Sequence, residues 1–323
     1  MTPLIEAEGL TKHFGLGRNQ TVHAVDDVSL HIDQREIVGL VGESGSGKST
    51  FGKTLLGLLD KTAGQVKYQG ETLPQSYGPG DFQRHAQTMQ MIFQDPYSSL
   101  NPRMTVGEIV GEGLRLHTSL SGREVRDRVG DWLERVGLNA AHMARYPHEF
   151  SGGQRQRIGI ARALIMSPEF VVCDEPISAL DVSVQAQVVN LLGELKESMG
   201  LTMLFIAHDL SMVRYVSDRM AVMYLGSLIE LGVSNNVFFH PKHPYTQMLV
   251  GSNPEPDPAT ERGRGRTAIR GEIPSPVNIQ PGCRFANRCP KVMDVCRGTT
   301  PELKSVADPE GKEPDRLIAC HLY

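Results

Sequence analysis

Alternating hydrophobic and polar residues occupy the first part of the chain. Stretches such as LIEAEGL and VDDVSLHI, between Leu4 and about Ile37, have the two-residue period of β-strands. We expect these strands to form a mostly antiparallel sheet. The run EIVGLVG that follows is almost entirely apolar, which predicts a buried central strand.

The period becomes helical between Pro96 and Ser151. Apolar residues recur there on one helical face, with Arg, Asp and Glu opposite. They are Val125, Val129, Trp132, Leu133 and Val136. We predict a helical subdomain over about residues 96–165, in which Trp132 is a core residue without a ligand role.

Strand and helix patterns alternate after Pro168. The runs FVVCDEP and MLFIAHD read as strands, and the periodic segment VQAQVVNLLGELKESMG between them reads as a helix, which predicts a parallel α/β core. Residues 251–271 are rich in Pro, Gly and charge and have no period, so we expect a linker. No solenoid repeat and no second copy of the motifs below occurs in the sequence.

Composition and charge exclude several classes of protein. The 323 residues have a net charge of −4 and no long basic runs, which disfavours DNA or RNA as a ligand. The first residues, MTPLIEAEGL, do not have the pattern of a secretory signal, and no apolar run reaches membrane-spanning length. We therefore expect a cytosolic protein, whose thiols stay reduced or bind metal.

A glycine-rich phosphate-binding motif follows the predicted central strand. Residues 42–49 read GESGSGKS and match GxxxxGK[ST], and the helical segment FGKTLLGLL comes next. Backbone N–H groups of such a loop and the positive end of the helix dipole bind phosphate oxygens. We expect Lys48 to reach the β- and γ-phosphates, Ser49 to ligate Mg²⁺ and Thr50 to contact the α-phosphate side. The predicted nucleotide-binding residues here are Gly42, Ser44, Gly45, Ser46, Gly47, Lys48, Ser49 and Thr50.

Two adjacent carboxylates end the strand predicted from FVVCDEP. Asp174 is placed to hold Mg²⁺ through water opposite Ser49. Glu175 follows directly, and a carboxylate beside the metal can deprotonate the attacking water. We assign Glu175 as the general base.

The segment FSGGQRQRIGIARAL, residues 150–164, closely resembles the signature of the ATP-binding-cassette (ABC) ATPases, which is usually LSGGQ. Ser151 is expected to cap a helix whose first N–H groups, with those of Gly152, Gly153 and Gln154, face a γ-phosphate. The resemblance implies that this phosphate belongs to ATP bound by a second ABC subunit. Two cassettes then enclose two nucleotides head to tail, and a monomer hydrolyses ATP poorly.

Four further residues match family positions. By the resemblance, Phe14 stacks on adenine, and Gln94 senses Mg²⁺ and the γ-phosphate while linking the core to the helical subdomain. Asp181 in SALD corresponds to the subunit-contact loop. His208 corresponds to the switch histidine that hydrogen-bonds the γ-phosphate. We therefore predict Lys48, Gln94, Glu175 and His208 as the catalytic residues, with Gln94 also a Mg²⁺ ligand.

The resemblance extends to the ATPase subunits of oligopeptide, dipeptide and nickel importers. It rests on FQDPYSSLNPR, SALDVSVQAQV, MYLGSLIELG, HPKHPYTQ and GEIPSPV and covers nearly the whole chain. It implies a protein on the cytosolic face of a bacterial inner membrane, docked to two membrane-spanning permeases, fed by an extracytoplasmic binding protein and often paired with a different ATPase chain. Peptide is the family's commonest substrate, and nickel, glutathione and oligosaccharide stay open. A DNA-repair ABC ATPase and a regulatory ATPase without a membrane partner are rival interpretations.

Four of the five cysteines lie near the end of the chain. Cys283, Cys289, Cys296 and Cys320 are separated by five, six and twenty-three residues, whereas Cys173 lies in a predicted core strand. The segment PGCRFANRCP also resembles the C-terminal extension of the peptide-importer ATPases. Four thiolates hold either zinc or an iron–sulfur cluster, and the CxxC pair usual for zinc is missing. We favour a 4Fe-4S cluster that ties down the extension, with zinc as the alternative and free thiols or disulfides less favoured.

These patterns together predict an α/β fold of the P-loop ABC type. It has a parallel core, an antiparallel β subdomain and a helical subdomain. We expect an ATPase domain over residues 1–250 and a linker with the cysteine-bearing extension over 251–323.

Overall fold

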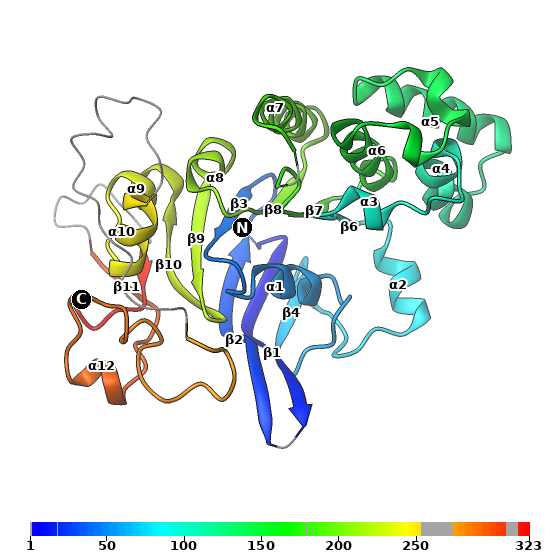
Figure 1. The fold of residues 1–323 in the computed structure, drawn as a ribbon. Coiled ribbons are helices and arrows are strands. Elements are labelled where there is room, and N and C mark those ends of the chain that lie inside the picture. The colour runs from blue at the N-terminus through cyan, green and yellow to red at the C-terminus, as the bar shows by residue number, and fades with distance from the viewer. Residues whose placement is uncertain (1, 18, 179, 253–273, 308–315) are drawn as a thin grey trace, which may run out of the picture.

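Two β-sheets and a layer of helices make up the fold (Figure 1). The computed structural model describes residues 2–17, 19–178, 180–252, 274–307 and 316–323. The smaller sheet is antiparallel, with the strand order β2-β1-β4-β5. Its strands are β1 (Ile5–Gly17), β2 (Gln20–Ile32), β4 (Ala63–Tyr68) and β5 (Glu71–Thr72). The antiparallel sheet predicted near the N-terminus is confirmed.

The larger sheet has eight strands in the order β11-β12-β10-β9-β3-β8-β7-β6. They are β3 (Ile37–Val41), β6 (Met89–Ile92), β7 (Phe170–Asp174), β8 (Thr202–Ile206), β9 (Arg219–Tyr224), β10 (Ser227–Val233), β11 (Lys304–Ser305) and β12 (Leu317–Ile318). The run from β9 to β6 is parallel, and the pairs beyond β9 are antiparallel. Every residue of β3, β7 and β8 is buried, as expected for central parallel strands. The predicted parallel core is confirmed.

Helix α1 (Lys48–Leu55) lies between the two sheets. Its Phe51 and Leu55 join a core with Leu10 and Val25 of the small sheet and Leu204 of β8. This packing fixes the start of α1 directly after the carboxyl end of β3. The carboxyl ends of β3, β7 and β8 meet at one edge of the sheet, because these strands are parallel.

The predicted helical subdomain is present. It contains α3 (Pro96–Ser99), α4 (Val106–His117), α5 (Gly122–Arg135), η1 (Ala140–Ala144), η2 (Pro147–Glu149) and α6 (Gly152–Leu164). Capping boxes start its longer helices: Thr105 with Glu108 for α4, and Ser121 with Glu124 for α5. Trp132 is 6% exposed and packs in the core, as predicted.

The remaining helices cover the large sheet and the C-terminal part. They are α2 (Pro79–His85), α7 (Val182–Met199), α8 (Leu210–Val216), α9 (Ser234–Phe239), α10 (Pro244–Gly251) and α12 (Val295–Gly298). Helix α7 is the one predicted from VQAQVVNLLGELKESMG. Most of the predicted linker, residues 253–271, lies outside the described residues. Within the described ranges, we find no helix of sufficient length and apolar character to cross a membrane.

The C-terminal extension packs onto the cassette. Strand β12 pairs with β10 through Glu230 and Ile318, and β11 pairs with β12. Phe285 is 2% exposed and belongs to the same core cluster as the helical subdomain, against which Cys283 and Cys289 also pack. The sequence patterns did not predict these strands.

Candidate functional site

A cavity of about 460 Å³ lies at the edge where β3, β7 and β8 end. Residues 44–50 form one wall of it, and Gln94, Glu175 and His208 form another. Val22 and Ala24 of β2, together with Pro276 of the extension, complete the lining. Most of the residues predicted to bind or hydrolyse nucleotide therefore surround one space.

The phosphate loop (residues 42–49) is shaped by glycine at its last turn. Gly47 has a φ of +100°, and a Cβ atom there would lie 2.0 Å from the carbonyl oxygen of Ala24. Only glycine fits this position, because a side chain meets both strained backbone and a neighbouring strand. The turn presents the first N–H groups of α1 to the cavity.

Lys48 is 4% exposed, and its ammonium lies inside the phosphate loop. Its Nζ donates to the carbonyl oxygens of Gly42 at 2.8 Å and Glu43 at 3.0 Å. Burial lowers the pKa of Lys48, whereas the charges of Glu175, Asp174 and Glu43 act in the opposite direction. The ammonium is thus held at the loop by carbonyl groups.

Ser49 and Asp174 are paired across the cavity edge. The Ser49 hydroxyl donates to Asp174 Oδ1 at 2.6 Å, and Asp174 is 2% exposed. Lys53 Nζ lies 4.0 Å from the other carboxylate oxygen. A hydroxyl beside a carboxylate is a donor set that suits Mg²⁺.

Glu175, Gln94 and His208 converge from different segments. Gln94 Nε2 donates to Glu175 Oε2 at 2.9 Å, and His208 Nδ1 lies 3.8 Å from the same oxygen. Glu175 has a φ of +43°, an unusual value for a residue with a side chain. Its N–H donates to the Ile206 carbonyl at 3.0 Å, which holds the strained backbone against β8.

Phe14 lies beside the cavity. It pairs with Val22 in the β1–β2 ladder, is 36% exposed, and has Lys12 Nζ 4.8 Å from its ring centroid. Val22 lines the cavity, whereas Phe14 does not. The structure thus places the predicted adenine-stacking residue opposite Val22, a residue that lines the cavity.

The signature residues lie apart from this cavity. Ser151 caps α6, accepting from the Gln154 N–H at 3.3 Å, and its own N–H donates to Gln154 Oε1 at 3.0 Å. A Cβ on Gly153 would lie 2.5 Å from Val184 Cγ1, so α6 packs closely on α7, which starts after Asp181. Gly152 lies in the same first turn. The described residues that line the nucleotide cavity do not include Ser151, Gly152, Gly153, Gln154 or Asp181.

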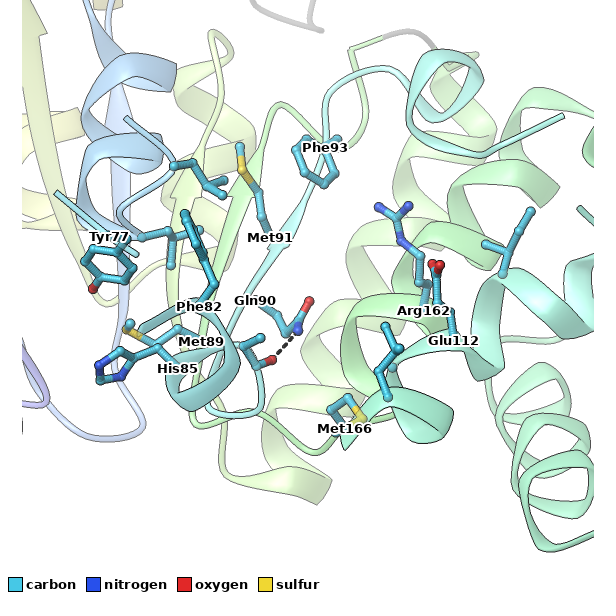
Figure 2. A pocket seen from close by; sticks show the side chains of 16 residues that line it. Tyr77, Phe82, His85, Met89, Gln90, Met91, Phe93, Glu112, Arg162 and Met166 are labelled. Atoms are coloured by element: carbon cyan, nitrogen blue, oxygen red, sulfur yellow. Dashed lines mark hydrogen bonds between the residues drawn. The ribbon is translucent and has the colours of Figure 1, made fainter. Parts of the chain in front are cut away.

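A second cavity of about 330 Å³ lies between the large sheet and the helical subdomain, and the sequence analysis did not identify it. Figure 2 shows aromatic and methionine side chains from α2 and β6 on one wall and side chains of α4 and α6 on the other. Labelled residues on the two walls are Tyr77, Phe82, Met89, Glu112, Arg162 and Met166. Arg162 Nη1 donates to the Ser99 carbonyl at 2.6 Å, and burial lowers the pKa of Arg162. The lining is largely apolar with a fixed cation at one side.

The four C-terminal thiols interact electrostatically. Burial raises the pKa of Cys283 to about 11, and the charges of Cys296, Cys320 and Cys289 add to this increase. Cys283 N–H donates to the Cys296 carbonyl at 2.8 Å, and Lys291 N–H donates to Cys289 Sγ at 3.4 Å. The thiols are nevertheless spaced too widely for three of them to lie within 4.8 Å of one another.

In the described ranges, the group whose ligand atoms do lie within 4.8 Å of one another is His13, His23 and Asp26. Asp26 accepts from His13 Nε2 and His23 Nδ1, each at 3.1 Å, and from the guanidinium of Arg284. The arginine already balances the carboxylate charge. This group therefore links the small sheet to the extension as an ion-pair network.

Comparisons with known proteins agree with the fold and identify the family. Residues 25–178 match the family model described as ABC transporter, and residues 229–296 match the model described as oligopeptide/dipeptide transporter, C-terminal region. The putative oligopeptide transport ATP-binding protein YkfD of Bacillus subtilis (strain 168) is 53% identical over 99% of this chain and 96% of its own length. The oligopeptide transport ATP-binding protein OppF of Salmonella typhimurium is 49% identical over 93% of this chain and 92% of its own.

Solved structures show the same fold. The post-hydrolysis dimer of the ATP-binding cassette MJ0796 with ADP and Pi has a TM-score of 0.66 and 28% identity, covering 71% of this chain and 98% of that one. The structure of cbiO1 from Clostridium perfringens, part of the ABC transporter complex cbiONQ, has a TM-score of 0.65 and 26% identity, covering 74% of this chain and 92% of that one. The chain therefore belongs to the ABC transporter family, as an ATPase of the branch that contains the oligopeptide and dipeptide transport ATP-binding proteins.

Proposed function

We propose that this protein binds and hydrolyses ATP to drive the import of di- or oligopeptides across a bacterial inner membrane. The observation that carries the proposal is the convergence of the phosphate loop, the Ser49–Asp174 pair and the Gln94–Glu175–His208 group on one cavity. The likeness to peptide-transport relatives over nearly the whole chain supports peptide as the substrate.

The residues of the cavity have separate roles in binding and hydrolysing ATP. N–H groups of the phosphate loop and the Lys48 ammonium bind the β- and γ-phosphates. Ser49, Asp174 and Gln94 would hold Mg²⁺, which would supply positive charge to offset the negative charge of the phosphates. Water attacks the γ-phosphorus, Glu175 accepts a proton from that water, and ADP leaves. Gln94 and His208 hold the Glu175 carboxylate and the attacking water in line.

Hydrolysis requires a second ABC subunit. The capped N-terminus of α6, with Ser151, Gly152, Gly153 and Gln154, does not line the chain's own nucleotide cavity. We propose that it completes the ATP site of the partner subunit, with Asp181 at the contact between the subunits. The dimeric state of the solved cassette MJ0796 supports this arrangement. The partner is a homologous chain, and a heterodimer is the arrangement we favour.

The apolar cavity in Figure 2 is our candidate for the docking site of a permease helix. It opens between the large sheet and the helical subdomain, and Gln94 lies two residues after β6, which forms part of its wall. A helix seated there would respond to a shift of the helical subdomain caused by γ-phosphate contacts at Gln94. Two membrane-spanning permeases and an indirectly attached substrate-binding protein complete the proposed importer, which places this chain on the cytoplasmic membrane face.

We propose that Cys283, Cys289, Cys296 and Cys320 hold a 4Fe-4S cluster. Their sequence spacing lacks the CxxC pair usual for zinc sites, which favours a cluster over a single tetrahedral ion. The cluster supplies binding free energy that holds the extension in place. Iron and sulfide analysis of anaerobically purified protein tests this, and stoichiometric zinc without iron would contradict it.

Transport assays test the proposed substrate. The protein and its permeases, reconstituted in vesicles with the binding protein, should accumulate labelled peptide when ATP is supplied on the side of the ATPase. A parallel panel contains Ni²⁺, glutathione and an oligosaccharide. Uptake of one of these without peptide uptake would contradict the peptide assignment, and purification of the tagged chain without permeases would contradict the transporter role.

A further inference from the structure

The extension makes a buried ion pair with the phosphate loop. Arg288 donates from Nη1 to Glu43 Oε2 at 2.7 Å and from Nη2 to Glu43 Oε1 at 2.9 Å. The Arg288 side chain is 2% exposed and that of Glu43 is 18% exposed. Such a two-point contact fixes both distance and orientation, because the guanidinium and the carboxylate are each planar.

Glu43 is the second residue of the phosphate loop, and it is held at three places. Its side chain accepts from Arg288, its N–H donates to the Tyr245 hydroxyl at 2.9 Å, and its carbonyl accepts from Lys48 Nζ at 3.0 Å. The same residue thus contacts the extension and the lysine that we expect to bind phosphate. A displacement of Glu43 moves the acceptor of the Lys48 ammonium.

Arg288 belongs to a short segment that packs rigidly behind this loop. We call residues 283–289 the cysteine loop. Turns within it are closed by hydrogen bonds from Ala286 N–H to Cys283 O at 2.9 Å and from Arg288 N–H to Phe285 O at 3.0 Å. Phe285 packs against Tyr224 and Tyr245, with ring centroids 5.4 and 5.5 Å apart. Two thiols therefore border a loop whose side chains reach the phosphate loop.

A second contact joins the extension to β2 at the nucleotide cavity. Val277 bridges to Val22, and His23 N–H donates to the Pro276 carbonyl at 2.9 Å. Both Val22 and Pro276 line the nucleotide cavity. The extension therefore lines the nucleotide cavity through Pro276 and separately holds Glu43 of the phosphate loop.

We propose that Arg288 is a positioning residue for ATP binding, which acts through Glu43 so that the cysteine-bearing extension sets the affinity of the phosphate loop. This inference rests on the proposed assignment of residues 42–49 as the loop that binds ATP. Arg288 does not itself contact nucleotide in this account. Its action is to hold the loop in the conformation that accepts the phosphates.

A double-mutant cycle on the full-length protein tests the proposal. We would measure the Kd of a fluorescent Mg-ATP analogue for the wild type, Glu43→Gln, Arg288→Lys and the double variant. Glu43→Gln keeps the shape but removes the charge, and Arg288→Lys keeps the charge but loses the two-point geometry. Each single change should raise the Kd about tenfold. The Kd of the double variant should not exceed the higher of the two single-variant Kd values, because the two residues act through one contact.

A matched control separates positioning from stability. Arg316 and Glu230 form another buried pair between the extension and the cassette, at 1% and 0% exposure. Arg316→Lys should lower the melting temperature and leave the Kd unchanged, because Arg316 donates to Glu230, Asn236 and His240, which lie outside the phosphate loop. A purely structural defect lowers the titration amplitude, whereas the Kd of the remaining folded protein does not change.

The outcomes are distinct. An unchanged Kd in Glu43→Gln and Arg288→Lys, or an equal rise in Arg316→Lys, would overturn the inference. If Arg288→Lys does not fold, the Kd of Glu43→Gln alone tests the inference, because this variant leaves the sequence of the extension unchanged. The Kd of Lys48→Ala is measured alongside, and a normal value would overturn the proposed phosphate loop. A raised Kd in Lys48→Ala, with unchanged Kd values in the Glu43 and Arg288 variants, would refute only the inference about Arg288.

Discussion

The buried pair between Glu230 of β10 and Arg316 gives a stability prediction for the attachment of the extension. Glu230 is 0% exposed and accepts from Arg316 Nε at 3.1 Å and from the N–H groups of Lys242 and His243, each at 3.0 Å. In Arg316→Met the carboxylate keeps its backbone donors but loses its balancing cation. Removal of one partner of a buried pair costs about 3–5 kcal/mol, which is a large share of a typical unfolding free energy of about 5–15 kcal/mol.

Chemical denaturation followed by far-ultraviolet circular dichroism measures this loss. The control is Glu230→Gln combined with Arg316→Met, in which no charge is left buried. We expect the double variant to recover at least about 1 kcal/mol relative to Arg316→Met alone. A loss below about 1 kcal/mol in the single variant, or a double variant as unstable as the sum of the singles, would refute the reasoning.

Three further changes test other parts of the account. Burial lowers the pKa of His243 from 6.5 to about 4, so the folded state binds fewer protons than the unfolded state between these pH values. The melting temperature should therefore fall as the pH drops from 6.5 to 4. The variant His243→Asn keeps an acceptor for the Tyr245 N–H and should flatten this pH dependence. Gly47→Ala should abolish ATP binding, because the added Cβ would lie 2.0 Å from the carbonyl oxygen of Ala24. Gly45→Ala should reduce binding less, because nothing lies within 4 Å of its Cβ. Equal effects of the two substitutions would count against the steric argument. Glu175→Gln should lower kcat about 10²- to 10⁴-fold while ATP still binds, and retained hydrolysis would exclude Glu175 as the base.

The sequence predicted the parts of the fold that have a local signal. The uniformly apolar runs became β3, β7 and β8, and the helical period around Trp132 became α5. The site followed from the same patterns, because parallel strands bring their carboxyl ends to one edge and the motifs lie at those ends. Lys48, Asp174 and Glu175 could be predicted for this reason.

Other features have no local signal. Strands β11 and β12 are two residues long, which is too short for a period to appear. The Arg288–Glu43 pair joins positions 245 residues apart, and Pro276 reaches the nucleotide cavity only because the extension folds back on β2. Contacts of this kind depend on tertiary packing, which a single sequence does not display.

The role predicted for Phe14, stacking on adenine, rests only on its position in the sequence. Its place in the sequence predicted stacking on adenine, yet Val22, its partner in the ladder, is the residue that lines the cavity. The β1–β2 ladder places the two residues opposite each other. Substitution of Phe14 by Ala, compared with Val22→Ala, would show which of the two contacts the base.

The central claim is that ATP is bound by the phosphate loop of one subunit and completed by the signature helix of the other. The most direct measurement is the structure of the Glu175→Gln dimer trapped with Mg-ATP. The account predicts that Ser151 Oγ or the adjacent N–H groups lie within hydrogen-bond distance, about 3 Å, of the γ-phosphate held by residues 42–49 of the partner. A closed dimer in which Ser151 lies far from that phosphate would contradict it.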